Sequence, residues 1–100
     1  MEYSIIINPE AELDLAEIFD YYQRQREGLG LHFVDKFEQC LQKLLQNPFH
    51  TLNVGNNIRR IVTPIFPYNI YYIVLEHEIV IYGVLHQARK PDRIFKRLKN

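Results

Sequence analysis

The hydrophobic and polar positions of the chain follow more than one period. Residues 3–7 form a short run of β-prone side chains, Tyr-Ser-Ile-Ile-Ile, which is typical of a strand. Between residues 15 and 22, and again between residues 33 and 44, apolar side chains recur every three or four positions. That spacing places them on one face of a helix, so the pattern predicts one strand followed by two amphipathic helices.

The ends of both helices carry sequence signals. Asn8 is a suitable N-cap, Pro9 suits the first helical position, and acidic residues follow near the positive end of the helix dipole. Gly28-Leu29-Gly30 predicts a tight connection between the helices, and Asn47-Pro48 ends the second one. Helices joined by so short a loop are predicted to pack as an antiparallel hairpin.

The second half of the chain is rich in β-prone residues. Residues 49–57 contain several Asn and a Gly and predict a loop. Three β-rich segments follow, at residues 58–63, 68–75 and 79–86, and their short connections predict an antiparallel meander. Residues 92–98 are basic and predict a short terminal helix or a tail.

Together these elements predict an α+β fold in the order β-α-α-β-β-β. The helical hairpin is expected to pack on a small, mainly antiparallel sheet, within a single domain that spans residues 1–100. Whether the N-terminal strand pairs with an edge or a central strand stays open. The tyrosines at 68, 71, 72 and 82 are predicted to pack in the core and sheet rather than to stack on bases.

The composition indicates the cellular environment of the protein and whether it binds a metal ion or another cofactor. The longest apolar runs fall far short of the ~20 residues that a membrane helix needs, so no membrane span is expected. The N-terminus, with Glu2, lacks the basic segment of a signal peptide, and the lone Cys40 fits a reducing cytoplasm. The four histidines are scattered, and the glycines form no phosphate-binding loop. Neither a metal ion nor another cofactor is therefore expected.

The net charge of zero conceals an asymmetry between the two halves of the chain. Residues 1–50 carry four Lys or Arg against nine Asp or Glu, a net charge of −5. Residues 51–100 carry eight against three, a net charge of +5. This distribution predicts one acidic surface and one basic surface that suits a polyanion. The alternative is two solvated faces that neutralise each other.

Seven short motifs occur in a characteristic order. They are Asn8-Pro9-Glu10-Ala11; Asp14 to Ile18 with Tyr21-Tyr22; Gly30 with Phe33 and Phe37-Glu38; Asn47-Pro48; Ile58-Arg59-Arg60; Phe66-Pro67-Tyr68 with Ile70 and Tyr72; and Val84-Leu85-His86 with Arg89 and Pro91. In this order they resemble the RelE/ParE family, the toxins of bacterial type II toxin–antitoxin modules that serve plasmid stabilisation or stress responses.

The resemblance implies a protein partner and a target. Family toxins are held inactive by a cognate antitoxin, whose tail wraps across the helical hairpin or the sheet, so a toxin–antitoxin hetero-oligomer is expected. The family divides into inhibitors of DNA gyrase, similar to ParE, and ribosome-dependent mRNA endonucleases, similar to RelE. A third alternative is an inactive homologue that acts only as a binding module.

An endonuclease of this family would need an acid or base and a cation for the phosphate. Histidine in general titrates near neutrality, so His86 is the candidate acid or base, with Arg60 or Arg89 holding the phosphate. The alternative for His86 is a structural hydrogen bond at the end of its strand. Alternation along the strand also places Arg59 and Arg60 on opposite faces, so only one of them can point towards a given site.

A gyrase inhibitor would need a binding surface rather than a catalytic site. The near-neutral pI of about 6.9 favours this branch, since ribosome contact suits a strongly basic protein. The Phe66-Pro67-Tyr68 segment, followed by Val84-Leu85-His86, also resembles ParE more than RelE. The candidate residues for binding a target or nucleic acid are Arg59, Arg60, Arg89, Lys90, Arg93, Lys96 and Arg97. For the last five, the alternative is a tail that the charges keep solvated.

Overall fold

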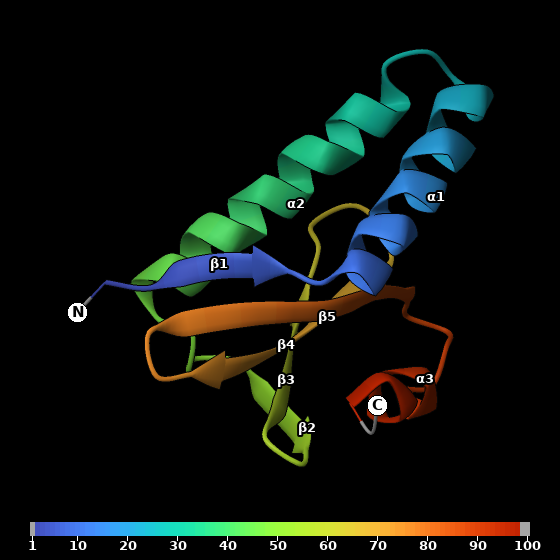
Figure 1. The fold of residues 1–100 in the computed structure, drawn as a ribbon. Helices are drawn as coiled ribbons and strands as arrows, with labels where there is room; N and C mark the ends of the chain where they lie inside the picture. Colours follow the sequence, from blue (N-terminus) through green and yellow to red (C-terminus); the bar gives the residue numbers. More distant parts are fainter. Residues whose placement is uncertain (1, 99–100) are drawn as a thin grey trace.

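The computed structural model describes residues 2–98, which form five strands and three helices (Figure 1). In chain order these are β1 (Ser4–Ile7), α1 (Pro9–Gln25), α2 (Leu29–Gln46), β2 (Leu52–Gly55), β3 (Ile58–Val62), β4 (Tyr68–Leu75), β5 (Glu78–His86) and α3 (Asp92–Leu98). The hairpin of α1 and α2 covers one face of the sheet, and α3 lies on the other side (Figure 1). The predicted α+β fold is confirmed, and the basic C-terminal segment is a helix.

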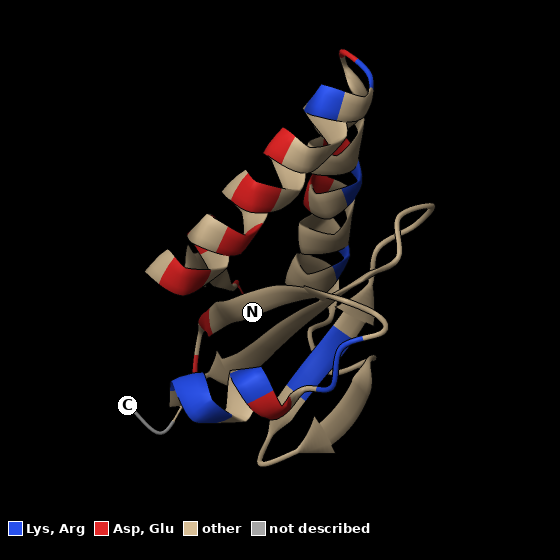
Figure 2. Ribbon diagram, turned by 90° about the vertical axis from the view of Figure 1, so that its right-hand side faces the viewer, with Lys and Arg blue, Asp and Glu red and all other residues tan. Residues whose placement is uncertain are grey.

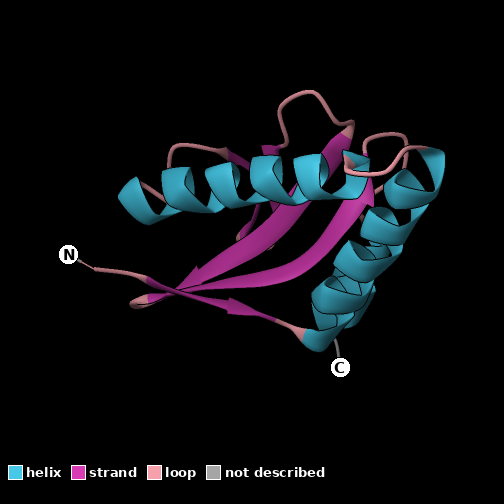
Figure 3. Cartoon of the chain, turned by 90° about the horizontal axis from the view of Figure 1, so that it is seen from above, coloured by secondary structure: helices cyan, strands magenta, loops and turns pink. Residues whose placement is uncertain are grey.

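The strands form one sheet in the order β1-β5-β4-β3-β2. The segments from β2 to β5 pair antiparallel, as the predicted meander requires. β1 lies at the edge and runs parallel to β5, which settles the placement that the sequence left open. Seen from the hairpin side, α2 passes across these strands (Figure 3).

The helical hairpin begins and ends close to the predicted residues. Pro9 is the first residue of α1 and Asn47 follows the last residue of α2. The predicted connection, however, is shorter than expected, because α2 already begins at Leu29. Gly28 makes the turn with a φ of +89°, and the side chain of Gln23 accepts hydrogen bonds from the N–H groups of Gly28 and Gly30. Gly30 therefore belongs to the helix.

The loop predicted for residues 49–57 was wrong in part, because Leu52–Gly55 forms strand β2. This strand pairs with β3 through a two-residue turn. Asn56 and Asn57 occupy the turn with φ values of +54° and +62°, the left-handed conformation that tight hairpin turns require and asparagine tolerates. The four residues of β2 are too short a pattern to indicate a strand within a segment that is rich in Asn and Gly.

Buried side chains gather on both faces of the sheet. Phe33, Phe37 and Leu44 of α2 pack against the hairpin face. On the other face, Ile58 and Leu85 pack with Ile94 of α3. Tyr71 and Tyr72 are both buried, one in each cluster, so the predicted packing role is confirmed for this pair. Within residues 2–98, no helix is long and apolar enough to cross a membrane.

Candidate functional site

The basic residues near the C-terminus form an exposed surface around α3. Arg89, Lys90, Arg93 and Lys96 are all exposed and line one shallow depression; we refer to these four as the cationic face. Figure 2 shows cations along α3 and carboxylates along the hairpin, chiefly on α1. The charge asymmetry of the sequence thus becomes a separation in space, with an acidic helical layer and a basic α3.

Arg97 does not join the cationic face. Its guanidinium forms a two-pronged ion pair with Asp14 of α1: Nη1 donates to Oδ2 at 2.7 Å and Nη2 donates to Oδ1 at 3.0 Å. Its Nε lies 3.3 Å from a carboxylate oxygen of Glu10. The Arg97 side chain is only 11% exposed, so its charge pairs with carboxylates of the protein itself and does not face a target.

The Asp14–Arg97 pair also forms hydrogen bonds with the backbone of β5. Beyond Ile7, β1 no longer runs beside this strand, and the pairing of β4 with β5 shifts register at Tyr71 and Tyr72. Here the N–H of Val84 donates to Asp14 Oδ2 at 2.9 Å, and Arg97 Nη1 donates to the C=O of Tyr82 at 2.9 Å. Buried backbone groups need such partners.

Arg59 and Arg60 lie on opposite faces of the sheet, as strand alternation predicts. Residues directly opposite each other in a ladder share a face. Arg59 lies opposite Tyr72, which packs on the hairpin side, whereas Arg60 lies opposite Tyr71, which packs on the α3 side. Arg59 donates to the C=O groups of Phe49 (3.2 Å) and Thr51 (2.7 Å), so it fastens the segment after α2.

His86 lies on the hairpin side, at the end of β5. It is opposite Tyr68 in the ladder, and the two rings meet edge to face with centroids 5.5 Å apart. Its Nδ1 accepts a hydrogen bond from the N–H of Ala88 at 3.0 Å. His86 and Arg89 line the same shallow pocket, but Arg60 is on the other face. The structure therefore brings His86 to Arg89 and not to Arg60.

Tyr68 adds no base to this pocket at neutral pH. Burial, followed by the hydrogen bond with Tyr22, raises the pKa of Tyr68 to about 12. Its phenol therefore stays protonated under physiological conditions and is a hydrogen-bond partner only. Within residues 2–98, no three His, Cys, Asp or Glu side chains gather as metal ligands.

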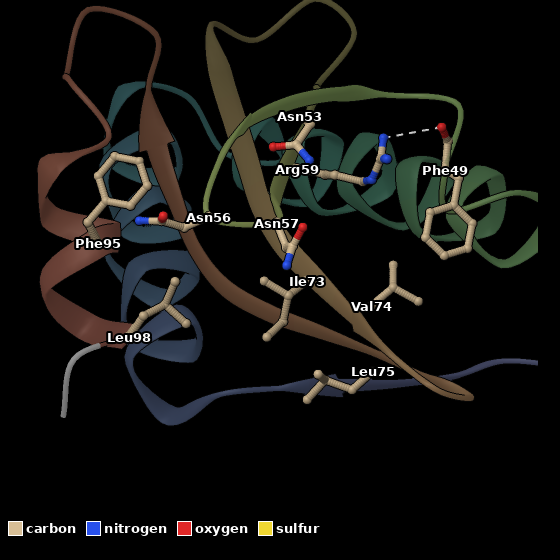
Figure 4. A pocket seen from close by; sticks show the side chains of 10 residues that line it. All are labelled: Phe49, Asn53, Asn56, Asn57, Arg59, Ile73, Val74, Leu75, Phe95 and Leu98. Atoms are coloured by element: carbon tan, nitrogen blue, oxygen red, sulfur yellow. Dashed lines mark hydrogen bonds between the residues drawn. The ribbon is translucent and has the colours of Figure 1, made fainter.

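A groove of about 530 Å³ opens between the β2–β3 turn, β4 and α3 (Figure 4). Its lining consists of Phe49, Asn53, Asn56, Asn57, Arg59, Ile73, Val74, Leu75, Phe95 and Leu98. The guanidinium of Arg59 lies over the ring of Phe49, 5.3 Å from its centroid. Apolar side chains, amides and one guanidinium can bind a ligand but include no group that titrates near neutrality. The groove is suited to binding rather than to acid–base chemistry.

Two features of this region escape sequence reasoning. The groove depends on β2, where the sequence predicted a loop, and on the packing of α3, which the sequence does not specify. The side chain of Asp14 is only 14% exposed, although carboxylates of an amphipathic helix usually face solvent. Its spacing contained a usable signal, because it lies three residues after Ala11 and four before Ile18, which are both buried.

Comparisons with known proteins agree with this architecture. A family model described as "ParE toxin of type II toxin-antitoxin system, parDE" matches residues 5–91. No curated protein sequence matches the chain.

Two solved structures share the fold. One is described as "Chromosomal ParDE TA system from P. aeruginosa", with a TM-score of 0.75 and 19% identity, covering 85% of this chain and 96% of that one. The other is a mutant of the E. coli toxin RelE in the free state, with a TM-score of 0.63 and 13% identity, covering 97% of this chain and 94% of that one.

Proposed function

The chain belongs to the ParE toxin family of type II toxin–antitoxin systems, and from this premise we propose that it arrests growth by binding DNA gyrase. The cationic face and the adjoining groove are the proposed contact surface. The protein acts in the cytoplasm, and a cognate antitoxin neutralises it as part of a toxin–antitoxin complex. No cofactor takes part in this function.

The observation that carries the proposal is the chemistry of this surface. Four exposed cations stand beside a groove of apolar and amide groups. Exposed cations steer association with an anionic partner, and the groove supplies apolar contact area. The groove offers no acid or base, and on the cationic face only Arg89 lies near one, His86, while Arg60 is on the other face of the sheet; this favours inhibition by binding over RNA cleavage.

The test compares two pairs of cations in a gyrase supercoiling assay. Arg93→Ala/Lys96→Ala removes two charges from the cationic face, and Arg24→Ala/Arg26→Ala removes two exposed charges from the far end of α1. We expect the first variant to lose at least about tenfold in inhibitory potency and the second to stay within about twofold, since only nearby charges act strongly at physiological salt. Equal potency of both variants would reject the cationic face as the contact surface.

A second candidate function rests on the pocket that His86 and Arg89 share. If the protein is instead an mRNA endonuclease, His86 supplies the acid or base and Arg89 holds the phosphate. His86→Ala then abolishes growth arrest and ribosome-dependent mRNA cleavage, while the variant stays folded. A gyrase inhibitor keeps its activity in the same variant. The sequence also made Arg60 a candidate for holding the phosphate, but Arg60 lies on the other face of the sheet, so cleavage retained in Arg60→Ala and lost in His86→Ala would restrict the site to His86 and Arg89.

The antitoxin is tested by co-expression. Expression of the protein alone should arrest growth, and co-expression of the small protein encoded beside it should restore growth and yield a complex that co-purifies. Normal growth at high levels of the folded protein alone would instead identify an inactive homologue that acts only as a binding module.

A further inference from the structure

The orientation of α3 depends on few contacts. The helix has seven residues, well below the roughly 12–15 at which an isolated helix becomes even marginally stable in water. Its first anchor is Ile94, which is fully buried against β5. Gly83 makes this possible, because a Cβ at that position would lie 2.3 Å from Ile94 Cδ1. Phe95 and Leu98 also pack against this cluster, but both are only partly buried, so Ile94 is the single fully buried side chain of α3.

The second anchor is the Asp14–Arg97 ion pair. Arg97 follows Ile94 by three residues, so both anchors project from the same side of α3. Arg93 and Lys96 lie on the exposed side and are fixed in direction once both anchors are in place. The carboxylate that receives Arg97 comes from α1, 83 residues earlier in the chain, and it is itself held by the N–H of Val84.

The guanidinium of Arg97 and the carboxylate of Asp14 are largely shielded from water. The hydrogen bond with Asp14 raises the pKa of Arg97 further, so its charge is permanent. The side chain of Asp14 is 14% exposed and that of Arg97 is 11% exposed. Ion pairs in such positions often contribute less net stability than apolar side chains of similar volume, so their main effect lies in fixing geometry.

On the basis of the proposed function, we infer that Asp14 and Arg97 are positioning residues for target recognition. The pair sets the direction of the cationic face relative to the sheet and the groove. Neither residue contacts the target. Loss of either partner releases the C-terminal end of α3, so Arg93 and Lys96 are no longer held in one direction beside Arg89 and Lys90, and the target is bound less tightly.

The charge change of the test variants separates this inference from plain electrostatics. Asp14→Asn makes the protein more positive, and if net charge alone mattered, binding to an anionic target would stay equal or become tighter. The positioning role predicts the opposite, weaker binding. Arg97→Lys keeps the positive charge but loses the two-pronged geometry, so this variant should also bind the target less tightly. Glu12→Gln is the matched control, because it removes one exposed carboxylate from the same helix.

The experiment measures gyrase inhibition, growth arrest and hydrogen exchange of the α3 amides with the full chain at about 25 °C. Asp14→Asn and Arg97→Lys are expected to lose at least about tenfold in potency and to exchange faster in α3, while Glu12→Gln keeps wild-type values. Leu44→Val, which trims the buried face of α2 in the core on the hairpin side, controls for a general loss of stability. It should keep its potency even where its thermal midpoint falls as far as that of Asp14→Asn.

Two results would overturn the inference. One is unchanged exchange of the α3 amides in Asp14→Asn, which would show that the pair does not hold the helix. The other is full potency despite lost protection, which would make the pair purely structural. A wild-type protein that arrests growth without inhibiting gyrase contradicts the proposed target instead. In that case, growth arrest measured with the same four variants still tests whether the ion pair positions α3, because this measurement does not depend on gyrase.

Discussion

Ile65 has a backbone conformation that its side chain disfavours. Its φ of +73° lies in the left-handed region, which β-branched residues rarely occupy. It is the middle residue of a three-residue turn in which the N–H of Phe66 donates to the C=O of Pro64 at 2.7 Å. The buried hydroxyl of Thr63 donates to the C=O of Phe66 at 2.6 Å and holds the turn closed. The Ile65 side chain itself is 74% exposed, so little packing compensates the strain.

Ile65→Gly is therefore expected to stabilise the protein. Relief of left-handed strain is worth about 1–3 kcal/mol, and the more flexible unfolded chain offsets about 0.5–1 kcal/mol of it. A net gain of about 1 kcal/mol raises the thermal midpoint of a domain this size by roughly 4–8 °C. Thermal unfolding followed by circular dichroism measures the shift. Ile65→Ala is the control, because Ala removes the side chain but keeps the strained φ; equal midpoints for the two variants would argue against strain.

At the scale of elements, the hairpin depends on a close approach of α1 and α2 at Gly30. A Cβ at this position would lie 2.7 Å from the C=O oxygen of Phe19. Gly30→Ala must push the helices apart, and we expect the free energy of unfolding to fall by about 1–3 kcal/mol. Urea denaturation measures this loss.

The neighbouring Gly28 provides the comparison for that prediction. Nothing lies within 4 Å of a Cβ on Gly28, so Gly28→Ala meets only the strain of a φ of +89°. Its expected loss is about 1 kcal/mol, at the low end of the cost of left-handed backbone. If Gly28→Ala is the more damaging change, backbone conformation rather than helix contact governs this connection.

The elements that the sequence predicted correctly are those with a long, local signal. Apolar periodicity located α1 and α2, and dense β-prone runs located β4 and β5, because each pattern repeats over many residues. β2 has only four residues, in a segment rich in Asn and Gly that indicates a loop, so its existence depends on pairing with β3. The roles predicted for His86 and the arginines stay predictions, but their relative placement depends on register, which periodicity does not supply.

At the scale of the molecule, the features around α3 depend on contacts between distant parts of the chain. The groove joins residues from the β2–β3 turn with residues of α3, and the Arg97–Asp14 pair joins the two ends of the sequence. Charge counts in each half of the chain indicated separate acidic and basic surfaces. They did not distinguish the exposed Lys96 from the internal Arg97, because that difference depends on how α3 docks.

This division between exposed and internal charges predicts different responses to salt. Raising the sodium chloride concentration from about 0.15 to about 1 M shortens the screening length from about 8 to about 3 Å. Binding to purified gyrase, measured by fluorescence anisotropy, should therefore weaken at least about tenfold, since Arg93 and Lys96 are exposed. The Arg93→Ala/Lys96→Ala variant should lose much less over the same range. The fold should respond little, because solvent ions screen the mostly buried Asp14–Arg97 pair poorly, so the thermal midpoint stays nearly constant. Equal salt dependence in wild type and variant would place the electrostatic contact with gyrase outside the cationic face.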